Sequence, residues 1–344
     1  MSYISIAIRV IANLESLSGV ETVGNLSRHR TAPVVIPQSD GYVIRFLPVI
    51  SGESLAHAYQ ELLVEEAKIR SLPLGKHSQR CEFLKFCDEN ILSEEGITPP
   101  ENEEDIRRAE VDILLKDFVS DVGGFLYAGR KGMPIKRTSC FQVGYAIPAI
   151  WEREVAALES QFHVRFSPSK MDLQMPYNVE VGSAIYNFTF NMDLSRIGIP
   201  STQFGKRNEE KEKRLLESRQ QRVQASLSAL IKFYSYLPFG AKRSRFLPNM
   251  EPVSAVAAYS RNARFVVSPG NEKGFIARSE ERKTAFINTL KQSVGNLNIE
   301  PDVKLFAYDR EEATKGVAVT TYPTLEDMLK SMLESLSEEA RKNV

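Results

Sequence analysis

The chain has 344 residues, of which 42% are hydrophobic and 26% are charged, a composition typical of a globular protein with a sizeable core. Lysine plus arginine and aspartate plus glutamate number 44 each, so the formal net charge is zero, which argues against a protein that coats nucleic acid by charge alone. Three cysteines without a CxxC pair argue against a disulfide framework, and the alternating N-terminus is neither a signal peptide nor a membrane span. We therefore expect a cytoplasmic protein.

The N-terminal part predicts two strands followed by a helix. Residues 3–12 alternate between apolar side chains and a second face that includes Arg9. A further strand is predicted over residues 41–50, and a helix from Ser51 to about residue 70. The residues between the two strands favour a loop over a helix.

This intervening segment, residues 24–30, reads Gly-Asn-Leu-Ser-Arg-His-Arg. It crowds hydrogen-bond donors and positive charge into one short stretch, and these donors are Asn25, Ser27, Arg28, His29 and Arg30. A polar, basic loop between strands is suited to binding phosphates. The same residues are compatible with a solvated surface loop.

The rest of the chain alternates between further predicted strands and helices. Helices are predicted over 104–118, 207–236, 278–292 and 324–337, and strands over 140–147, 159–167, 177–191, 252–259 and 303–308. Residues 94–106 form an acidic loop, and residues 120–139 are glycine-rich and basic. This order predicts a mixed α+β fold with a mostly antiparallel sheet.

Common catalytic signatures are absent from the sequence. It holds no GxxxxGK[ST], HExxH, GxSxG or helix-opening GxGxxG motif. No histidine has metal-ligand spacing to another histidine or cysteine. General acid–base cleavage of RNA by His29, His57 or His163 stays an alternative.

Basic residues gather in four clusters, while the acidic residues concentrate in 93–112 and 209–217. The clusters are Arg28 to Arg30, then Arg130 and Lys131 with Lys136 and Arg137, then His163 with Arg165, and finally Lys242, Arg243 and Arg245. His163 and Arg165 share one face of a strand by its period of two. The segregation fits one basic groove, and charge alone is equally compatible with four unrelated patches.

Two other segments combine features of a binding site with a simpler explanation. The helix start at Ser51 offers free N–H groups to an anion, with Ser54 and His57 one turn apart, although the serines can equally serve as caps. Residues 167–178 place Met171, Leu173 and Met175 in a polar connection. Such apolar side chains can wedge between bases, contact a partner protein or pack on the core.

Together these segments resemble the backbone subunit of archaeal type I-A CRISPR interference complexes, the Cas-seven group, also called DevR-like autoregulators. The resemblance is carried by residues 14–34, 48–59, 121–128, 161–166 and 242–248 in this order, and it extends from about residue 3 to residue 260.

The resemblance implies a modified RRM-like (ferredoxin-like) core over 1–344, with a finger insertion at about 71–139 and a thumb loop at about 167–178. It implies a scaffold without catalytic activity or cofactor, which forms a filament of several copies along a guide RNA (crRNA). The filament presents the guide for pairing with target DNA in antiviral defence, together with other Cascade subunits.

The resemblance also suggests roles for individual residues. Guide contacts are expected from Arg9, the 24–30 segment, Ser51, Ser54, His57, Arg130, Lys131, Lys136, Arg137, His163, Arg165, Lys242, Arg243 and Arg245, and wedge contacts from Met171, Leu173 and Met175. The aromatic signature of ordinary RRMs is absent, so backbone binding is expected in place of base stacking. The alternatives are a metal-independent RNA-processing endonuclease and a transcriptional autoregulator, for which we find no helix-turn-helix.

Overall fold

The computed structural model describes residues 2–129, 132–151, 156–167, 170–293, 301–314 and 316–342. The chain divides into two compact units. The helical unit comprises Met1–Ile4, Ala56–Gln142 and Asn191–Pro238, and the sheet unit comprises Ser5–Leu55, Val143–Phe190 and Phe239–Val344. The predicted finger, residues 71–139, falls entirely within the helical unit. Within the described residues, no helix is long and apolar enough to cross a membrane.

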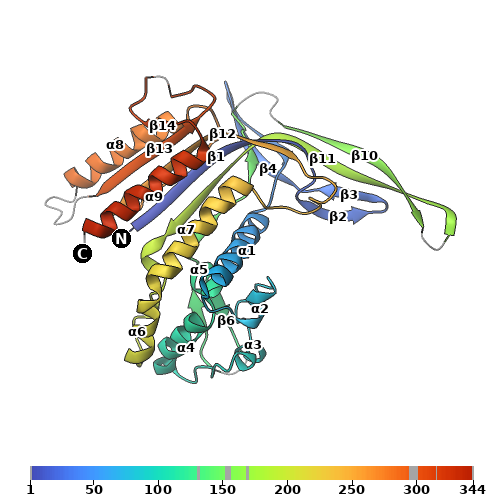
Figure 1. The fold of residues 1–344 in the computed structure, drawn as a ribbon. Helices are drawn as coiled ribbons and strands as arrows, with labels where there is room; N and C mark the ends of the chain where they lie inside the picture. Colours follow the sequence, from blue (N-terminus) through green and yellow to red (C-terminus); the bar gives the residue numbers. More distant parts are fainter. Residues whose placement is uncertain are drawn as a thin grey trace. The chain divides into compact units, whose positions relative to one another are not determined.

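A ten-stranded sheet runs through the described residues in the order β14-β13-β12-β1-β11-β3-β2, and β8, β9 and β10 also pair with β11 (Figure 1). Its strands are β1 (Ser2–Glu15), β2 (Gly19–Val23), β3 (Leu26–His29), β8 (Phe141–Val143), β9 (Ile147–Pro148), β10 (Ala156–Ser167), β11 (Lys170–Asp193), β12 (Asn249–Arg261), β13 (Asp302–Asp309) and β14 (Thr320–Tyr322). Antiparallel pairs such as β12–β13 occur beside parallel pairs such as β13–β14 and β11–β3. The mixed α+β class predicted from the sequence is confirmed.

The core of the sheet unit follows from the strand register. Val256 lies opposite Ala307, and Ala258 lies opposite Leu305, so these side chains share one face of β12 and β13. They are buried in one cluster with residues from helix α8 (Phe275–Ser293). Helix α9 (Leu325–Lys342) also packs on β12 and β13 (Figure 1). Its buried residues Leu325, Met328, Leu329 and Met332 recur at helical spacing.

The helical unit has its own apolar core. Its elements are the greater part of α1 (Gly52–Arg70), α2 (Lys76–Gln79), α3 (Glu89–Glu94), α4 (Glu103–Lys116), α5 (Phe118–Gly123), the β6–β7 hairpin (Phe125–Tyr127 and Ile135–Arg137), the 3-10 helix η1 (Leu194–Arg196), α6 (Glu209–Glu217) and α7 (Arg219–Tyr236). The fully buried Leu92, Ile113, Leu114 and Tyr127 belong to one cluster that joins α3, α4 and the hairpin.

Several predicted elements differ from the structure. The predicted 24–30 loop is instead the turn and second strand of a β2–β3 hairpin. In this second strand, Leu26 and Ser27 also pair in parallel with β11. The 167–178 loop is largely strand, because β11 begins at Lys170 and pairs with β10. The predicted 207–236 helix is two helices separated at Ser218, whose hydroxyl donates to the Leu215 carbonyl oxygen at 2.8 Å.

A separate two-stranded sheet, β4 (Thr31–Gln38) with β5 (Gly41–Pro48), carries an exposed apolar face. Its register places Pro33 opposite Phe46, Val35 opposite Ile44 and Pro37 opposite Tyr42. Val35, Tyr42, Ile44 and Phe46 are between 53% and 79% exposed. Large exposed apolar patches of this kind mark interaction surfaces.

Candidate nucleic-acid interface

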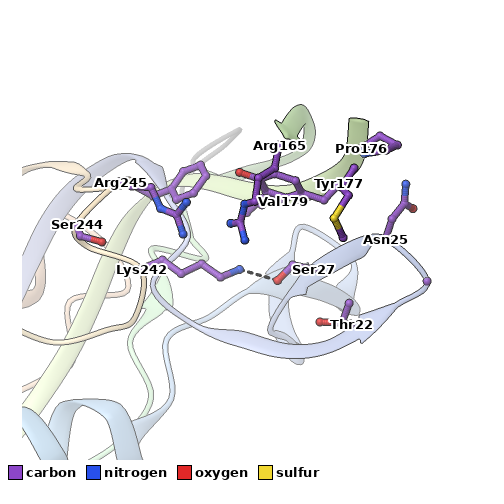
Figure 2. Close-up of a pocket in the computed structure, with 13 residues that line it drawn as sticks. Thr22, Asn25, Ser27, Arg165, Pro176, Tyr177, Val179, Lys242, Ser244 and Arg245 are labelled. Atoms are coloured by element: carbon purple, nitrogen blue, oxygen red, sulfur yellow. Dashed lines mark hydrogen bonds between the residues drawn. The ribbon is translucent and has the colours of Figure 1, made fainter. Parts of the chain in front are cut away.

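Three chain segments that lie far apart in sequence surround one cavity in the sheet unit (Figure 2). The cavity has a volume of about 460 Å³ and lies between the β2–β3 turn, the β10–β11 strands and the loop after α7. The 13 described lining residues are Thr22, Gly24, Asn25, Ser27, Arg165, Met175, Pro176, Tyr177, Val179, Lys242, Ser244, Arg245 and Phe246. None of these 13 residues is acidic.

The β2–β3 turn supplies one wall. Val23 lies opposite Leu26, so Gly24 and Asn25 form a two-residue turn. Gly24 has a φ of 62°, which such hairpin turns require and glycine adopts at little cost. The adjacent Ser27 is aligned with Val179 of β11, and both residues line the cavity.

The β10–β11 hairpin supplies the second wall through one of its faces. His163 lies opposite Tyr177, and Arg165 lies opposite Met175. The His163 and Tyr177 rings stack with their centroids 5.2 Å apart, and the Arg165 guanidinium carbon lies 5.3 Å from the Tyr177 centroid. The Nε2 atom of His163 is buried and has no hydrogen-bond partner among the described residues.

The loop after α7 supplies the third wall and is fixed at its base. Gly240 has a φ of 95° and lies so close to Leu17 that a Cβ atom would contact that side chain at 2.5 Å. The next residue, Ala241, donates its N–H to the Leu17 carbonyl oxygen at 2.7 Å. Lys242 then reaches across the cavity and donates to the Ser27 hydroxyl at 2.6 Å (Figure 2). Partial burial lowers the pKa of Lys242 below its ordinary value.

No described carboxylate forms an ion pair with Arg165, Lys242 or Arg245, the three cations that line this cavity. Three positive side chains around a cavity with no acidic side chain among its described lining residues create a field that favours an anion. The cavity thus combines cations, hydrogen-bonding side chains and aromatic rings, which are the groups that single-stranded nucleic acids contact.

The structure brings together residues from four separate predicted groups: Asn25, Ser27, Arg165, Met175, Lys242 and Arg245. Sequence reasoning did not name the other seven lining residues as site residues: Thr22, Gly24, Pro176, Tyr177, Val179, Ser244 and Phe246. The sequence offered one signal for Tyr177, since an aromatic residue beside a basic strand is typical of nucleic-acid-binding surfaces. Its contact with His163 depends on the strand register, which the sequence does not give.

Arg9 does not belong to an exposed RNA contact, and this prediction was wrong. Its side chain is fully buried and pairs with Glu311, with N–O distances of 2.8 and 3.1 Å, while Nη1 donates to the Gly270 carbonyl oxygen at 2.9 Å. A guanidinium without solvent exposure stabilises the fold around it and is not available to a phosphate.

His29 is also buried, so its predicted RNA contact is corrected. Its Nε2 lies 2.6 Å from Oε1 of Glu15, which also accepts a hydrogen bond from Tyr186 at 2.6 Å. Burial lowers the pKa of His29, but the hydrogen bond and charge of Glu15, the Arg30 carbonyl and the charge of Glu180 together leave the pKa above its ordinary value. Burial raises the pKa of Glu15, and the contacts with His29 and Tyr186 bring it below its ordinary value.

The predicted RNA contact of Arg137 is also corrected, because its side chain is buried. Within the helical unit its guanidinium is fully buried, 2.5 Å from Asp121 and 3.1 Å from Glu110. Asp121 also accepts from Arg222 at 2.9 Å, so two arginines share one buried carboxylate. Burial lowers the pKa of Arg137, but the interactions with Asp121, Cys140 and Glu110 together leave the pKa above its ordinary value. This cluster supports the helical unit from inside.

At the start of α1, the structure confirms capping. The Ser51 hydroxyl accepts a hydrogen bond from the Ser54 N–H at 3.2 Å, and Ser51 is buried while Ser54 is half-buried. His57 is exposed, lies 3.3 Å from Glu61 and contacts the Phe83 ring edge-on. A phosphate contact by these residues stays a prediction.

The remaining predicted site residues do not line the cavity, or they lie outside the residues that the structure describes. Arg28 and Lys136 are exposed, and Arg28 lies 3.4 Å from Glu21. Arg30 and Arg243 are half-buried. Arg130, Lys131 and the side chains of Met171 and Leu173 lie outside the described residues. Among the described residues, no group of three or more His, Cys, Asp and Glu side chains is placed to hold a metal ion.

Comparison with known proteins places this chain among CRISPR-associated proteins. The chain belongs to the family described as CRISPR-associated negative auto-regulator DevR/Csa2, whose model matches residues 6–280. It is 44% identical to the CRISPR-associated aCascade subunit Cas7/Csa2 2 of Saccharolobus solfataricus, over 96% of this chain and 99% of that protein. This similarity shows a Cas7-type relationship to an archaeal Cascade subunit.

The chain is also similar to a more distant relative and to a solved structure. The chain is 29% identical to the CRISPR-associated protein Cas7/Csa2 1 of Saccharolobus solfataricus, over 87% of this chain and 96% of that protein. A solved chain of a CRISPR RNA-guided surveillance complex in a pre-nicking state covers 97% of this chain and 99% of its own length, with a TM-score of 0.50. At 11% sequence identity, this structure shows a shared fold and nothing further.

Proposed function

We propose that this chain is a non-catalytic backbone subunit that binds a CRISPR guide RNA and, in several copies within a Cascade complex, presents the guide to target DNA. The observation that carries the proposal is the convergence of Arg165, Lys242 and Arg245 on one cavity whose described lining residues include no acidic side chain. The similarity to a protein named as an aCascade subunit supports the same function.

The proposal includes an RRM-like core that consists of β1, β11, β12 and β13 with helices α8 and α9. Supporting this, β1 lies between β12 and β11 in the sheet, and both helices pack on β12 and β13. The β10–β11 hairpin, which extends past β3 in the sheet unit (Figure 1), is the proposed thumb. Among the three predicted wedge residues, Met175 is the one whose side chain the structure describes, and it is 52% exposed near the tip of this hairpin.

The exposed β4–β5 face supports assembly with other protein chains. Four of its side chains, Val35, Tyr42, Ile44 and Phe46, are each more than half exposed. The two aromatic side chains among them, Tyr42 and Phe46, alone present roughly 230–380 Å² of surface, taking about 150–250 Å² for a fully exposed aromatic side chain. That area is a substantial part of the roughly 800 Å² that each partner buries in a standard interface.

The proposal is tested by purifying the protein without nuclease treatment and measuring particle mass together with the size and sequence of any bound nucleic acid. We expect particles of high mass that contain RNA of varied sequence. A nucleic-acid-free monomer that cuts added RNA, and loses this activity in a His57→Ala or His163→Ala variant, would replace the scaffold with an endonuclease. Selective binding to duplex DNA of its own promoter would replace it with an autoregulator.

A further inference from the structure

The β2–β3 hairpin lies at the edge of the sheet and is held there by few side chains. Strand β2 ends the path of paired strands, and all five of its residues are exposed. In β3, Leu26 and Ser27 are the residues that pair with β11. Among residues 19–29, all of which the structure describes, His29 is the only one that is buried. The attachment of the hairpin to the sheet therefore depends on a titratable side chain.

The ring of His29 has an oxygen atom close to each of its two nitrogen atoms. Nδ1 lies 2.8 Å from the carbonyl oxygen of Arg30, and Nε2 lies 2.6 Å from Oε1 of Glu15. A carbonyl oxygen only accepts, so Nδ1 carries a proton, and a neutral imidazole then has no proton on Nε2. An unprotonated Nε2 would direct its lone pair at the carboxylate. The arrangement therefore requires one proton more than a neutral histidine and an ionised glutamate hold together.

The other groups around this pair keep the carboxylate charged. Tyr186 of β11 donates its hydroxyl to Oε1 of Glu15 at 2.6 Å, and the Leu17 N–H donates to Oε2 at 2.8 Å. Burial raises the pKa of Tyr186 well above its ordinary value, so this hydroxyl keeps its proton. Glu180, also on β11, accepts the backbone N–H of His29 at 2.7 Å and adds a second negative charge. Two carboxylates thus face a ring that needs a positive charge.

We infer that His29 and Glu15 form a proton-dependent latch, which holds the β2–β3 hairpin on the sheet while the extra proton is bound and releases the hairpin when that proton passes to solvent. The hairpin carries Asn25, Ser27 and Arg28, so its release lowers the affinity for RNA. This inference rests on the proposed RNA-binding function and adds a regulation of that function by pH.

The latch is closed in mildly acidic and neutral solution and opens toward alkaline pH. Burial opposes the charge of His29, yet Glu15, the Arg30 carbonyl and Glu180 hold its pKa above the ordinary value of 6.5. In the released hairpin the ring is in water and has that ordinary value. The ratio of closed to open hairpin therefore falls as the pH rises from 6.5 to the pKa of the closed state, by up to about tenfold for each pH unit.

The first measurement uses the full-length wild-type protein without RNA. The chain has four histidines, so the His29 ring can be followed by nitrogen-15 NMR and assigned by its loss in His29→Gln. We expect the ring to keep two protons above pH 6.5, and amide hydrogen exchange of residues 19–29, corrected for the intrinsic effect of pH, to accelerate as the ring loses one. A ring that titrates at or below pH 6.5, or exchange that does not change with its titration, would overturn the latch.

Two variants act on the latch in different ways. Glu15→Gln supplies an amide N–H that can donate to a neutral Nε2, so the hairpin should stay protected from exchange up to pH 9. His29→Gln removes the titratable ring, so exchange should be fast at pH 6.5 and independent of pH. The matched control is His77→Gln in the helical unit, where His77 also lies near two carboxylates, Glu82 at 3.2 Å and Glu94 at 3.3 Å. This control should keep the wild-type pH dependence.

Titrations with a uridine RNA octamer connect the latch with RNA binding. Between pH 6.5 and pH 8.5, the affinity of the wild-type protein should fall at least about fivefold more than that of Glu15→Gln. Lys242, whose pKa partial burial lowers, is present in both proteins, so any loss of its charge affects both alike. Opening of the hairpin without this difference in affinity would overturn the regulation by pH. Failure of both proteins to bind the octamer at every pH would instead contradict the proposed function, while the exchange measured without RNA still decides on the latch.

Discussion

Arg137 in the helical unit and Arg165 in the sheet unit carry the same guanidinium group in opposite environments. Arg137 is fully buried and pairs with two carboxylates, Asp121 and Glu110. Arg165 is exposed, has no described carboxylate partner and lies over the ring of Tyr177. The pairing of a charge, more than its presence in a basic cluster, decides whether an arginine supports the fold or is available to a ligand.

The difference has an energetic basis. A buried charge is tolerated only when partners replace its lost hydration, and removing one partner of such a pair costs several kcal/mol. An unpaired, partly hydrated cation costs the fold little and keeps its charge for an incoming anion. Variants of the buried, paired cluster around Arg137 should therefore change stability. Variants of the unpaired cations at the cavity should change RNA affinity.

The largest effect is expected from Asp121→Asn. This substitution removes the negative charge that Arg137 and Arg222 share at 2.5 and 2.9 Å. We expect the free energy of unfolding to fall by about 3–5 kcal/mol, measured by urea denaturation. The RNA affinity of the folded protein should be unchanged. Normal stability with weakened RNA binding would contradict the structural role of this cluster.

An intermediate effect is expected from the double variant Lys242→Ala with Arg245→Ala. RNA affinity should fall for all sequences alike, and the dependence of log affinity on log salt should become shallower by about 0.7 for each phosphate that the variant no longer neutralises. The free energy of unfolding should change by less than about 0.5 kcal/mol. RNA titrations at several salt concentrations measure the affinity and its salt dependence, and urea denaturation measures the stability.

The matched control for the double variant is Lys330→Ala. Lys330 is an exposed lysine on α9 whose ammonium lies 3.8 Å from Glu334. Its removal should leave the affinity and the salt dependence unchanged. An equal loss of affinity in this control would show that the effect of the double variant reflects overall charge and not the cavity.

The smallest effect is expected from pH at the Glu15–His29 pair. The folded-state pKa of His29 is raised above its ordinary value of 6.5, so its stabilising contribution is complete below that pH and is lost as the pH rises through the folded pKa. The pKa of Glu15 is lowered from 4.5, so its contribution is lost as the pH falls from that value toward its folded pKa. The wild-type protein should therefore exceed His29→Gln in stability most clearly between these two ordinary values.

Urea denaturation of both proteins at pH 5.5 and pH 8.5 measures this contribution. We expect the stability difference between wild-type protein and His29→Gln to be smaller at pH 8.5. The groups that face His29 are Glu15 and Glu180, whose carboxylate accepts the His29 backbone N–H at 2.7 Å. A difference that grows with pH would show that His29 is neutral in the folded protein.

Local sequence patterns were sufficient for several elements. Alternation over residues 3–12 predicted β1, and the stripe after Ser51 predicted α1 together with its serine cap, since both signals depend on near neighbours. The same local reasoning placed residues 167–178 in a loop, because pairing with β10 is a contact between strands.

The sequence by itself determined the mixed α+β class, most strands and helices, the family resemblance and the existence of separate basic clusters. Only the tertiary structure decided which basic residues pair with acids and which remain available. Several carboxylates are distant in sequence from the cations that they neutralise, and no rule of sequence spacing predicts these pairs. They are Asp121, Glu110, Glu15 and Glu311. Burial and ion pairing depend on which segments meet in space, and the sequence encodes that only through the complete fold.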